Sequence, residues 1–240
     1  MSAFALNATA VLVHGAWADG SCWNNVILPL RQEGLAVMCA PIPLTSLNED
    51  IAALERALER TNGPVVLAGH AYGGAVIAGS KNDRVRSLVY VAALAPAQGE
   101  TVADVFYRAK PHPDAPKLQP DGHGFIWMPD GGFASAVAHN ASAGQTAILE
   151  AVQRPIAVNC IQEKAPAPAW KTKPSWFLLA EEDRMIPAET QRFMAERMGA
   201  AIRRYRVDHS PMYTAPEVVV GMILAAAKAT AGAETGSHAI

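Results

Sequence analysis

The sequence predicts an α/β fold with a mostly parallel central sheet, helices on both faces and one small insertion. Short apolar runs alternate with helical patterns, as expected of repeated βαβ units. A glycine-rich turn follows the third apolar run, and prolines and glycines are dense in the middle of the chain. The chain has 240 residues and is 50% hydrophobic. That length suits a single α/β domain with an extensive core.

Apolar runs bounded by turn residues mark the strands of the first half. We expect strands at Thr9–His14, Ala36–Pro41, Pro64–Ala68 and Val85–Ala92. The third strand is entered through the turn residues Asn-Gly-Pro at 62–64. Helical spacing predicts helices over Trp23–Glu33, over Leu47–Arg60, which begins after an Asn or Ser cap, and from the glycine-rich turn to about Ser80.

The composition changes between residues 95 and 173, where proline and glycine are frequent, as in "KPHPDAPKLQPDGHGF" and "QEKAPAPAWKTKP". This segment is too rich in proline to add strands to the sheet, so we expect a cap with helical pieces at Phe133–Asn140 and Gln145–Gln153. Regular alternation then returns, with strands expected at Ser175–Ala180 and Arg203–Val207 and helices at Ala188–Met198 and Ala215–Lys228. The predicted organisation is core 1–94, cap insertion 95–173, core 174–230 and a flexible tail 231–240.

Composition excludes several classes of partner and site. The net charge of −2 and the isoelectric point near 6.4 give no electrostatic reason to expect nucleic acid or an anionic membrane as a partner. No apolar run approaches the roughly 20 residues of a membrane span, and the start of the chain lacks a basic segment typical of a signal peptide. The cysteines lack metal-ligand spacing and are expected to be buried and reduced; they are Cys22, Cys39 and Cys160. These features favour a cytoplasmic protein.

A nucleophile elbow without its nucleophile is the strongest motif. In "VLAGHAYGG", residues 66–74, an apolar strand leads into a turn with the spacing G-x-S-x-G, and Ala71 stands where the serine belongs. Gly69, Gly73 and Gly74 supply the small neighbours that such a turn requires. Alanine adds no hydrogen bond and relieves no strain. The rest of the motif therefore indicates a site designed for a residue that is absent.

Three further stretches fit the same site. "VLVHGAW", residues 11–17, brings His14, Gly15 and Ala16 directly after the first strand, where a backbone N–H of an oxyanion hole is expected; Tyr72 would supply a second. "LAEEDRMIP" and "RVDHSPM" each begin at the end of a strand. They provide acids and then a histidine, in the order nucleophile, acid, histidine, and Glu181 and Glu182 compete with Asp183 for the acid.

Together, "VLVHGAW", "LAGHAYGG", "KPSWFLLAEEDRMIP" and "DHSPM" resemble the α/β-hydrolase superfamily, in particular a compact bacterial esterase branch similar to plant methylesterases and hydroxynitrile lyases. The resemblance implies an α/β-hydrolase fold. It also implies that Ala71 occupies the nucleophile position, that Asp183 is the acid and that His209 is the base. The N–H groups of Ala16 and Tyr72 would be the oxyanion donors. The departure from the family pattern is Ala71.

The remaining candidates have supporting or binding roles. We expect His14 and His70 to support the site by packing or polar contacts, and the helical stretches "ERALER" and "QRFMAERM" to be solvated faces. His112, His123 and His139 share no metal-ligand spacing. Substrate contacts are expected from Trp17, Phe125, Trp127 and Met212, with Phe133 and Trp170 as further candidates and about half of this set as core.

Three functional hypotheses follow. The first is a serine hydrolase that cleaves a small, apolar or aromatic carboxylic ester, or else a lactone or amide, through an acyl-enzyme, in an engineered form with alanine replacing the nucleophile. The second is a natural non-catalytic relative that binds a small molecule. The third is a lyase or cofactor-free oxygenase that uses His209 as a base. We favour the first, because one hydroxyl is missing while the supporting motifs remain. It implies a small ester-like partner and neither cofactor nor metal, and the oligomeric state is left open.

Overall fold

The computed structural model describes residues 6–236 and contains a six-stranded parallel sheet. Its strands are β1 (Thr9–Val13), β2 (Ala36–Ala40), β3 (Val65–His70), β4 (Val85–Val91), β7 (Ser175–Ala180) and β8 (Ala201–Tyr205). Their order across the sheet is β2-β1-β3-β4-β7-β8, and each neighbouring pair is parallel. Parallel strands of this kind need helices on both faces, which the sequence pattern also predicts.

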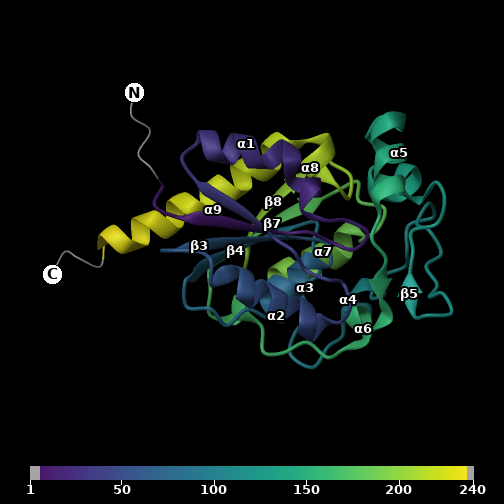
Figure 1. Cartoon of the computed structure of the whole chain (residues 1–240), viewed down its shortest axis with the longest axis horizontal. Helices are drawn as coiled ribbons and strands as arrows, with labels where there is room; N and C mark the ends of the chain where they lie inside the picture. Colours follow the sequence, from purple (N-terminus) through teal and green to yellow (C-terminus); the bar gives the residue numbers. More distant parts are fainter. Residues whose placement is uncertain (1–5, 237–240) are drawn as a thin grey trace.

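Helices cover the sheet in two layers (Figure 1). One layer contains α1 (Asn24–Gln32), α8 (Pro211–Thr214) and α9 (Pro216–Gly236), and the other contains α2 (Leu47–Leu58), α3 (Gly73–Ala78) and α7 (Ala188–Arg197). A 3-10 turn, η1 (Gly20–Trp23), precedes α1. The predicted fold class, a mostly parallel sheet flanked by helices, is confirmed.

The hydrophobic core is divided between the two faces of the sheet. Along β1, Val11 and Val13 pack toward the layer with α2 and α3, whereas Ala10 and Leu12 pack toward the layer with α1 and α9. This alternation follows from the two-residue period of a strand. Because both faces are covered, β1 and β3 are almost continuously apolar and buried.

Most elements begin or end one or more residues away from the predicted bounds, and two of these differences have a clear physical cause. Strand β8 lies at Ala201–Tyr205, two residues before the predicted Arg203–Val207. Strand β8 lies at the edge of the sheet, and most of its side chains are exposed. Its sequence therefore lacks the apolar run that would indicate where the strand begins, and its position is set by pairing with β7. Helix α9 continues past the predicted end at Lys228 to Gly236, through an alanine-rich stretch that favours helix. It thus extends into the expected tail, whose residues 237–240 lie outside the described part of the chain.

We keep the name cap segment for residues 95–173. It contains α4 (Val102–Phe106), the π-helical turn η2 (Phe133–Val137), α5 (Ala143–Val152), α6 (Val158–Gln162), the 3-10 turn η3 (Ala169–Lys171) and a small antiparallel sheet of β5 (Phe125–Ile126) and β6 (Ile156–Ala157). None of its described residues joins the six-stranded sheet. In Figure 1, α4, α5, α6 and β5 gather beside one end of that sheet. Over residues 6–236, we find no helix with the length and apolarity of a membrane span.

Candidate active site

Ala71 lies in a strained turn between β3 and α3. Its φ of +49° is in the left-handed region that residues with a Cβ adopt rarely. The turn is fixed by hydrogen bonds on both sides, because the Ala71 N–H donates to Val91 O (3.2 Å) and Ala71 O accepts from the N–H groups of Gly74 (3.0 Å) and Leu94 (2.9 Å). The surrounding backbone therefore holds the strained conformation whichever side chain occupies position 71.

The elbow glycines are required by close backbone contacts. A Cβ added to Gly69 would lie 2.6 Å from Gly73 O, and one on Gly73 would lie 2.6 Å from Val13 O. A Cβ on Gly74 would lie 2.5 Å from the carbonyl oxygen of Leu94. Real Cβ atoms do not approach backbone this closely, so these glycines let α3 start against β1 and β4.

The predicted acid and base form a buried pair. His209 Nδ1 and Asp183 Oδ2 are 2.8 Å apart, and the two side chains are 5% and 0% exposed. Because a carboxylate only accepts hydrogen bonds, Nδ1 carries a proton, and in the neutral imidazole Nε2 then keeps its lone pair. Of the candidate acids, Asp183 is the one that contacts His209. Glu182 forms an ion pair with Arg206 at 3.0 Å instead.

Three further donors fix the Asp183 carboxylate. The N–H groups of Met185 and Ile186 both donate to Oδ1 at 2.8 Å, and the side-chain amide of Gln191 donates to Oδ2 at 2.8 Å. Gln191 also donates to Ile186 O at 2.8 Å and is fully buried. We predicted that the stretch "QRFMAERM" is solvated, and this prediction is wrong for Gln191, which lies with Met194 on the buried face of α7. The spacing of three residues between Gln191 and Met194 is the feature of the sequence that could have indicated this shared face.

The turn that carries His209 is held from two sides. His70 Nε2 donates to His209 O at 2.7 Å, and the two rings lie 4.8 Å apart. Burial, reinforced by the neighbouring His209, lowers the pKa of His70 well below its ordinary value, so His70 is a neutral support, in line with its expected role. On the other side, the buried Asp208 accepts from the Ser210 N–H (3.1 Å) and from Asn140 N–H of the cap segment (3.0 Å).

The loop after β1 packs directly against the elbow. A Cβ on Gly15 would lie 3.0 Å from both Ala71 Cβ and His70 Nδ1. His14 is buried and donates from Nδ1 to Gly15 O at 2.8 Å, which matches its predicted structural role; burial lowers its pKa to about 4. This packing brings Ala16 to the same cavity as Ala71.

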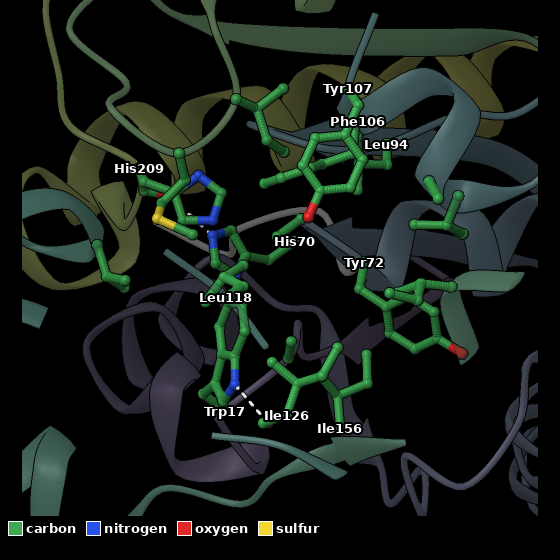
Figure 2. A pocket seen from close by; sticks show the side chains of 18 residues that line it. Trp17, His70, Tyr72, Leu94, Phe106, Tyr107, Leu118, Ile126, Ile156 and His209 are labelled. Carbon is green, nitrogen blue, oxygen red and sulfur yellow. Dashed lines mark hydrogen bonds between the residues drawn. The ribbon is translucent and has the colours of Figure 1, made fainter. Parts of the chain in front are cut away.

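One apolar pocket joins these predicted site residues (Figure 2). Ala71, His209, Ala16 and Tyr72 all line it. In the described part of the chain, the hydrogen bonds include none donated by the N–H of Ala16 or of Tyr72. The other lining residues are mainly apolar and include no Lys, Arg, Asp or Glu; they are Trp17, His70, Leu94, Val102, Ala103, Phe106, Tyr107, Leu118, Ile126, Val137, Ile156, Ile161, Met185 and Ile186.

Of the four predicted substrate contacts, only Trp17 lines this pocket, and its indole N–H donates to Ile126 O at 3.0 Å. Phe125 precedes Ile126 in β5 and so faces the other way; Ile126 is the lining residue. Trp127 is 47% exposed, and its indole donates to Asp121. The remaining candidates, Met212, Phe133 and Trp170, are buried in the core.

Several lining residues were not identified from the sequence. Phe106 and Tyr107 at the end of α4, Leu118 in the proline-rich loop and Ile161 in α6 all come from the cap segment. Leu118 lies in a loop without periodicity, and α4 and α6 are only five residues long, so no repeat in the sequence indicates which of these side chains point inward. Across residues 6–236, no cluster of three or more His, Cys, Asp or Glu side chains is arranged to bind a metal.

Several known proteins and one protein family are similar to this chain in sequence. A sequence model described as "Alpha/beta hydrolase family" matches residues 10–222. A carbendazim hydrolyzing esterase from Nocardioides sp. is 31% identical over 121 residues, which cover 43% of this chain and 49% of that esterase. The match therefore spans only about half the length of that relative.

Two solved structures share the fold. A pyrethroid hydrolase from Sphingobium faniae has a TM-score of 0.78 at 22% identity, covering 92% of this chain and 98% of that one. A methylesterase from Arabidopsis has a TM-score of 0.73 at 16% identity, covering 92% and 99%. With the sheet order, the elbow and the family match over residues 10–222, these findings show that the chain belongs to the alpha/beta hydrolase family.

Proposed function

We propose that this site is built for the hydrolysis of a small, neutral carboxylic ester and that it binds such an ester without cleaving it while Ala71 is present. One observation carries the proposal: the Asp183–His209 pair and a strained elbow open into one apolar pocket, where a nucleophilic hydroxyl is the missing part. The similar proteins are described as an esterase, a pyrethroid hydrolase and a methylesterase, which also favours ester chemistry.

A serine at position 71 would complete the mechanism. Its hydroxyl would attack the ester carbonyl while His209 Nε2 takes the proton, and Asp183 would hold the imidazole and stabilise its positive charge. The N–H groups of Ala16 and Tyr72 would bind the oxyanion. His209 would then give the proton to the departing alkoxide and activate the water that releases the acid.

The pocket lining supports a neutral, apolar substrate. Because no Lys or Arg lines the pocket, a charged carboxylate would lose its hydration without gaining a cationic partner. The free volume is about 70 Å³. A pocket of this volume favours an ester with a small acyl group. Esters rank above amides because an alkoxide leaves with less protonation than an amine.

The alanine chain lacks the group that forms the acyl-enzyme. In a protease, loss of the serine lowers turnover by roughly a millionfold, although residual binding and oxyanion stabilisation persist. We expect the same loss here, whether Ala71 arose by engineering or naturally. Binding is expected to survive because the side chain retains its Cβ and the pocket retains its shape.

The test is to compare the chain with its Ala71→Ser variant on short-chain aryl esters. We expect strong hydrolysis by Ala71→Ser, none by the unmodified chain, and none when His209→Ala is added to Ala71→Ser. Ala71→Gly is the matched control, because it changes the same turn without adding a hydroxyl.

Two results would contradict the proposal. If Ala71→Ser binds but does not cleave esters, lactones or amides, a non-catalytic binding function is favoured. If the unmodified chain turns over a substrate and His209→Ala abolishes that turnover, the site is a lyase or oxygenase with His209 as its base. The Asp183–His209 pair alone would suffice for such proton transfer.

A further inference from the structure

A buried carboxylate outside the Asp183–His209 pair contacts the elbow. Asp50 lies in the first turn of α2 and is completely buried. Its Oδ1 accepts from the Leu44 N–H at 2.7 Å, and its Oδ2 accepts from the Tyr72 hydroxyl at 2.6 Å and from the Cys160 thiol at 3.6 Å. Burial raises the pKa of this carboxyl group. Asp50 has no direct role in the proposed acyl-enzyme mechanism.

Tyr72 connects Asp50 to the predicted oxyanion site. Tyr72 follows Ala71 and is among the residues that line the pocket, and its phenol points away from His209 (Figure 2). The side chain is therefore held at its far end, while the backbone N–H is expected to face the substrate. Burial and the neighbouring Asp50 raise the pKa of the Tyr72 phenol well above its ordinary value, so the hydroxyl keeps its proton and remains a donor.

The same carboxylate also joins the cap segment to the core. Cys160 belongs to α6, and the N–H of Ala157, just before α6, donates to Leu44 O at 3.0 Å. Leu44 has a φ of +62°, a strained conformation that its hydrogen bond to Asp50 helps to hold. The Asp50 carboxylate thus contacts three segments: the elbow, the loop after β2, and α6.

We propose that Asp50 is a positioning residue for the oxyanion hole, which sets the direction of the Tyr72 N–H by anchoring the Tyr72 phenol. This inference rests on the proposed function. Its physical basis is that oxyanion stabilisation depends on the placement of each donor: losing one donor costs roughly 100- to 1000-fold in kcat, and a misplacement of about 1 Å costs roughly 100-fold.

The first test uses the Ala71→Ser background and adds Tyr72→Phe or Asp50→Asn. We expect kcat to fall roughly 10- to 100-fold, with KM changed less than about threefold, because the donor acts mainly on the developing charge. Tyr90→Phe is the matched control. Tyr90 is also fully buried, and its hydroxyl has no partner among the described residues, so removing that hydroxyl should leave both constants unchanged.

A thionoester substrate separates positioning from general damage. Sulfur in place of the carbonyl oxygen accepts hydrogen bonds weakly, so an intact oxyanion hole favours the ester over the thionoester. We expect Tyr72→Phe and Asp50→Asn to lower this ester-to-thionoester ratio of kcat/KM at least fivefold. Equal losses on both substrates, which leave the ratio unchanged, would overturn the inference. If Asp50→Asn fails to fold, Tyr72→Phe decides.

A binding measurement keeps this inference distinct from the proposed function. In the unmodified chain, calorimetry compares a small apolar ester with the ether that lacks its carbonyl. We expect preference for the ester, reduced severalfold by Tyr72→Phe and not by Tyr90→Phe. If Ala71→Ser is inert, the hydrolase proposal fails and this comparison alone decides the role of Asp50. Equal affinity of the unmodified chain for ester and ether, or a preference unaffected by Tyr72→Phe, would refute that role.

Discussion

His209 and Asp183 are separated by 26 positions in the chain, yet Nδ1 and Oδ2 lie 2.8 Å apart and both side chains are buried. They meet because β7 and β8 are neighbouring parallel strands, so the turns that follow them emerge at the same edge of the sheet. The elbow after β3 opens toward the same pocket. The contact between these two side chains is the basis of the first prediction.

Replacing Asp183 should abolish most of the activity that Ala71→Ser introduces. With Asp183→Asn in that background, the amide no longer selects the tautomer that leaves Nε2 unprotonated, so we expect kcat to fall roughly 10⁴-fold. Steady-state kinetics on an aryl ester measure the change. Glu182→Gln is the control, since Glu182 pairs with Arg206 at the surface and should alter kcat less than about twofold. A similar loss in both variants would argue against the assigned acid.

Trp17 and Trp127 should differ in ligand binding. Trp17→Phe removes part of the apolar surface that lines the pocket and breaks the indole hydrogen bond to Ile126 O, another lining residue. We therefore expect affinity for a small apolar ester to fall severalfold by calorimetry. Trp127→Phe makes the same replacement at a side chain outside the pocket and should leave affinity unchanged. Weaker binding in Trp127→Phe would restore that residue as a substrate contact.

Gly73 and Gly221 should respond oppositely to alanine. At Gly73 the new Cβ would lie 2.6 Å from Val13 O and 2.7 Å from His14 O, so we expect the free energy of unfolding to fall by roughly 1–3 kcal/mol or more. At Gly221, inside α9, no atom lies within 4 Å of the new Cβ, and Gly221→Ala should stabilise the protein by about 0.5–1 kcal/mol. Urea unfolding measures both. A neutral Gly73→Ala would contradict the close approach of α3 and β1.

Acid should destabilise the fold through His14. Burial lowers the pKa of His14 from 6.5 to about 4, so between these values the unfolded chain binds a proton that the folded chain does not. Stability is therefore highest above pH 6.5 and falls by up to about 3 kcal/mol as pH drops toward 4. His14→Gln removes this proton uptake and should flatten the dependence of unfolding free energy on pH. An unchanged slope in that variant would disprove the assignment.

The predictable parts of the fold and site are those encoded locally. The elbow, Asp183 and His209 each follow a strand within a few residues, so a strand prediction also places them at one edge of the sheet. Alternation of apolar and helical patterns was sufficient to predict the central strands, but it failed for β8, where exposed side chains left the register ambiguous.

The parts that escaped prediction depend on contacts between distant segments. Asp50 has the pattern of an acidic residue in the first turn of a helix, and only the packing of α2 against α3 brings it to the Tyr72 hydroxyl. In the cap segment, β5 is two residues long, so facing direction changes between Phe125 and Ile126 without any repeat to reveal it. Burial of Gln191 likewise depends on α7 docking against β7.

The left-handed turn at Ala71 persists without any hydroxyl to present, because its hydrogen bonds come from the backbone of neighbouring segments. An alanine and a serine are strained similarly at this φ, so exchanging them asks for no new loop conformation. Alanine and serine codons can differ by a single base. A point mutation in the gene could thus place a hydroxyl at position 71, in the pocket that His209 also lines.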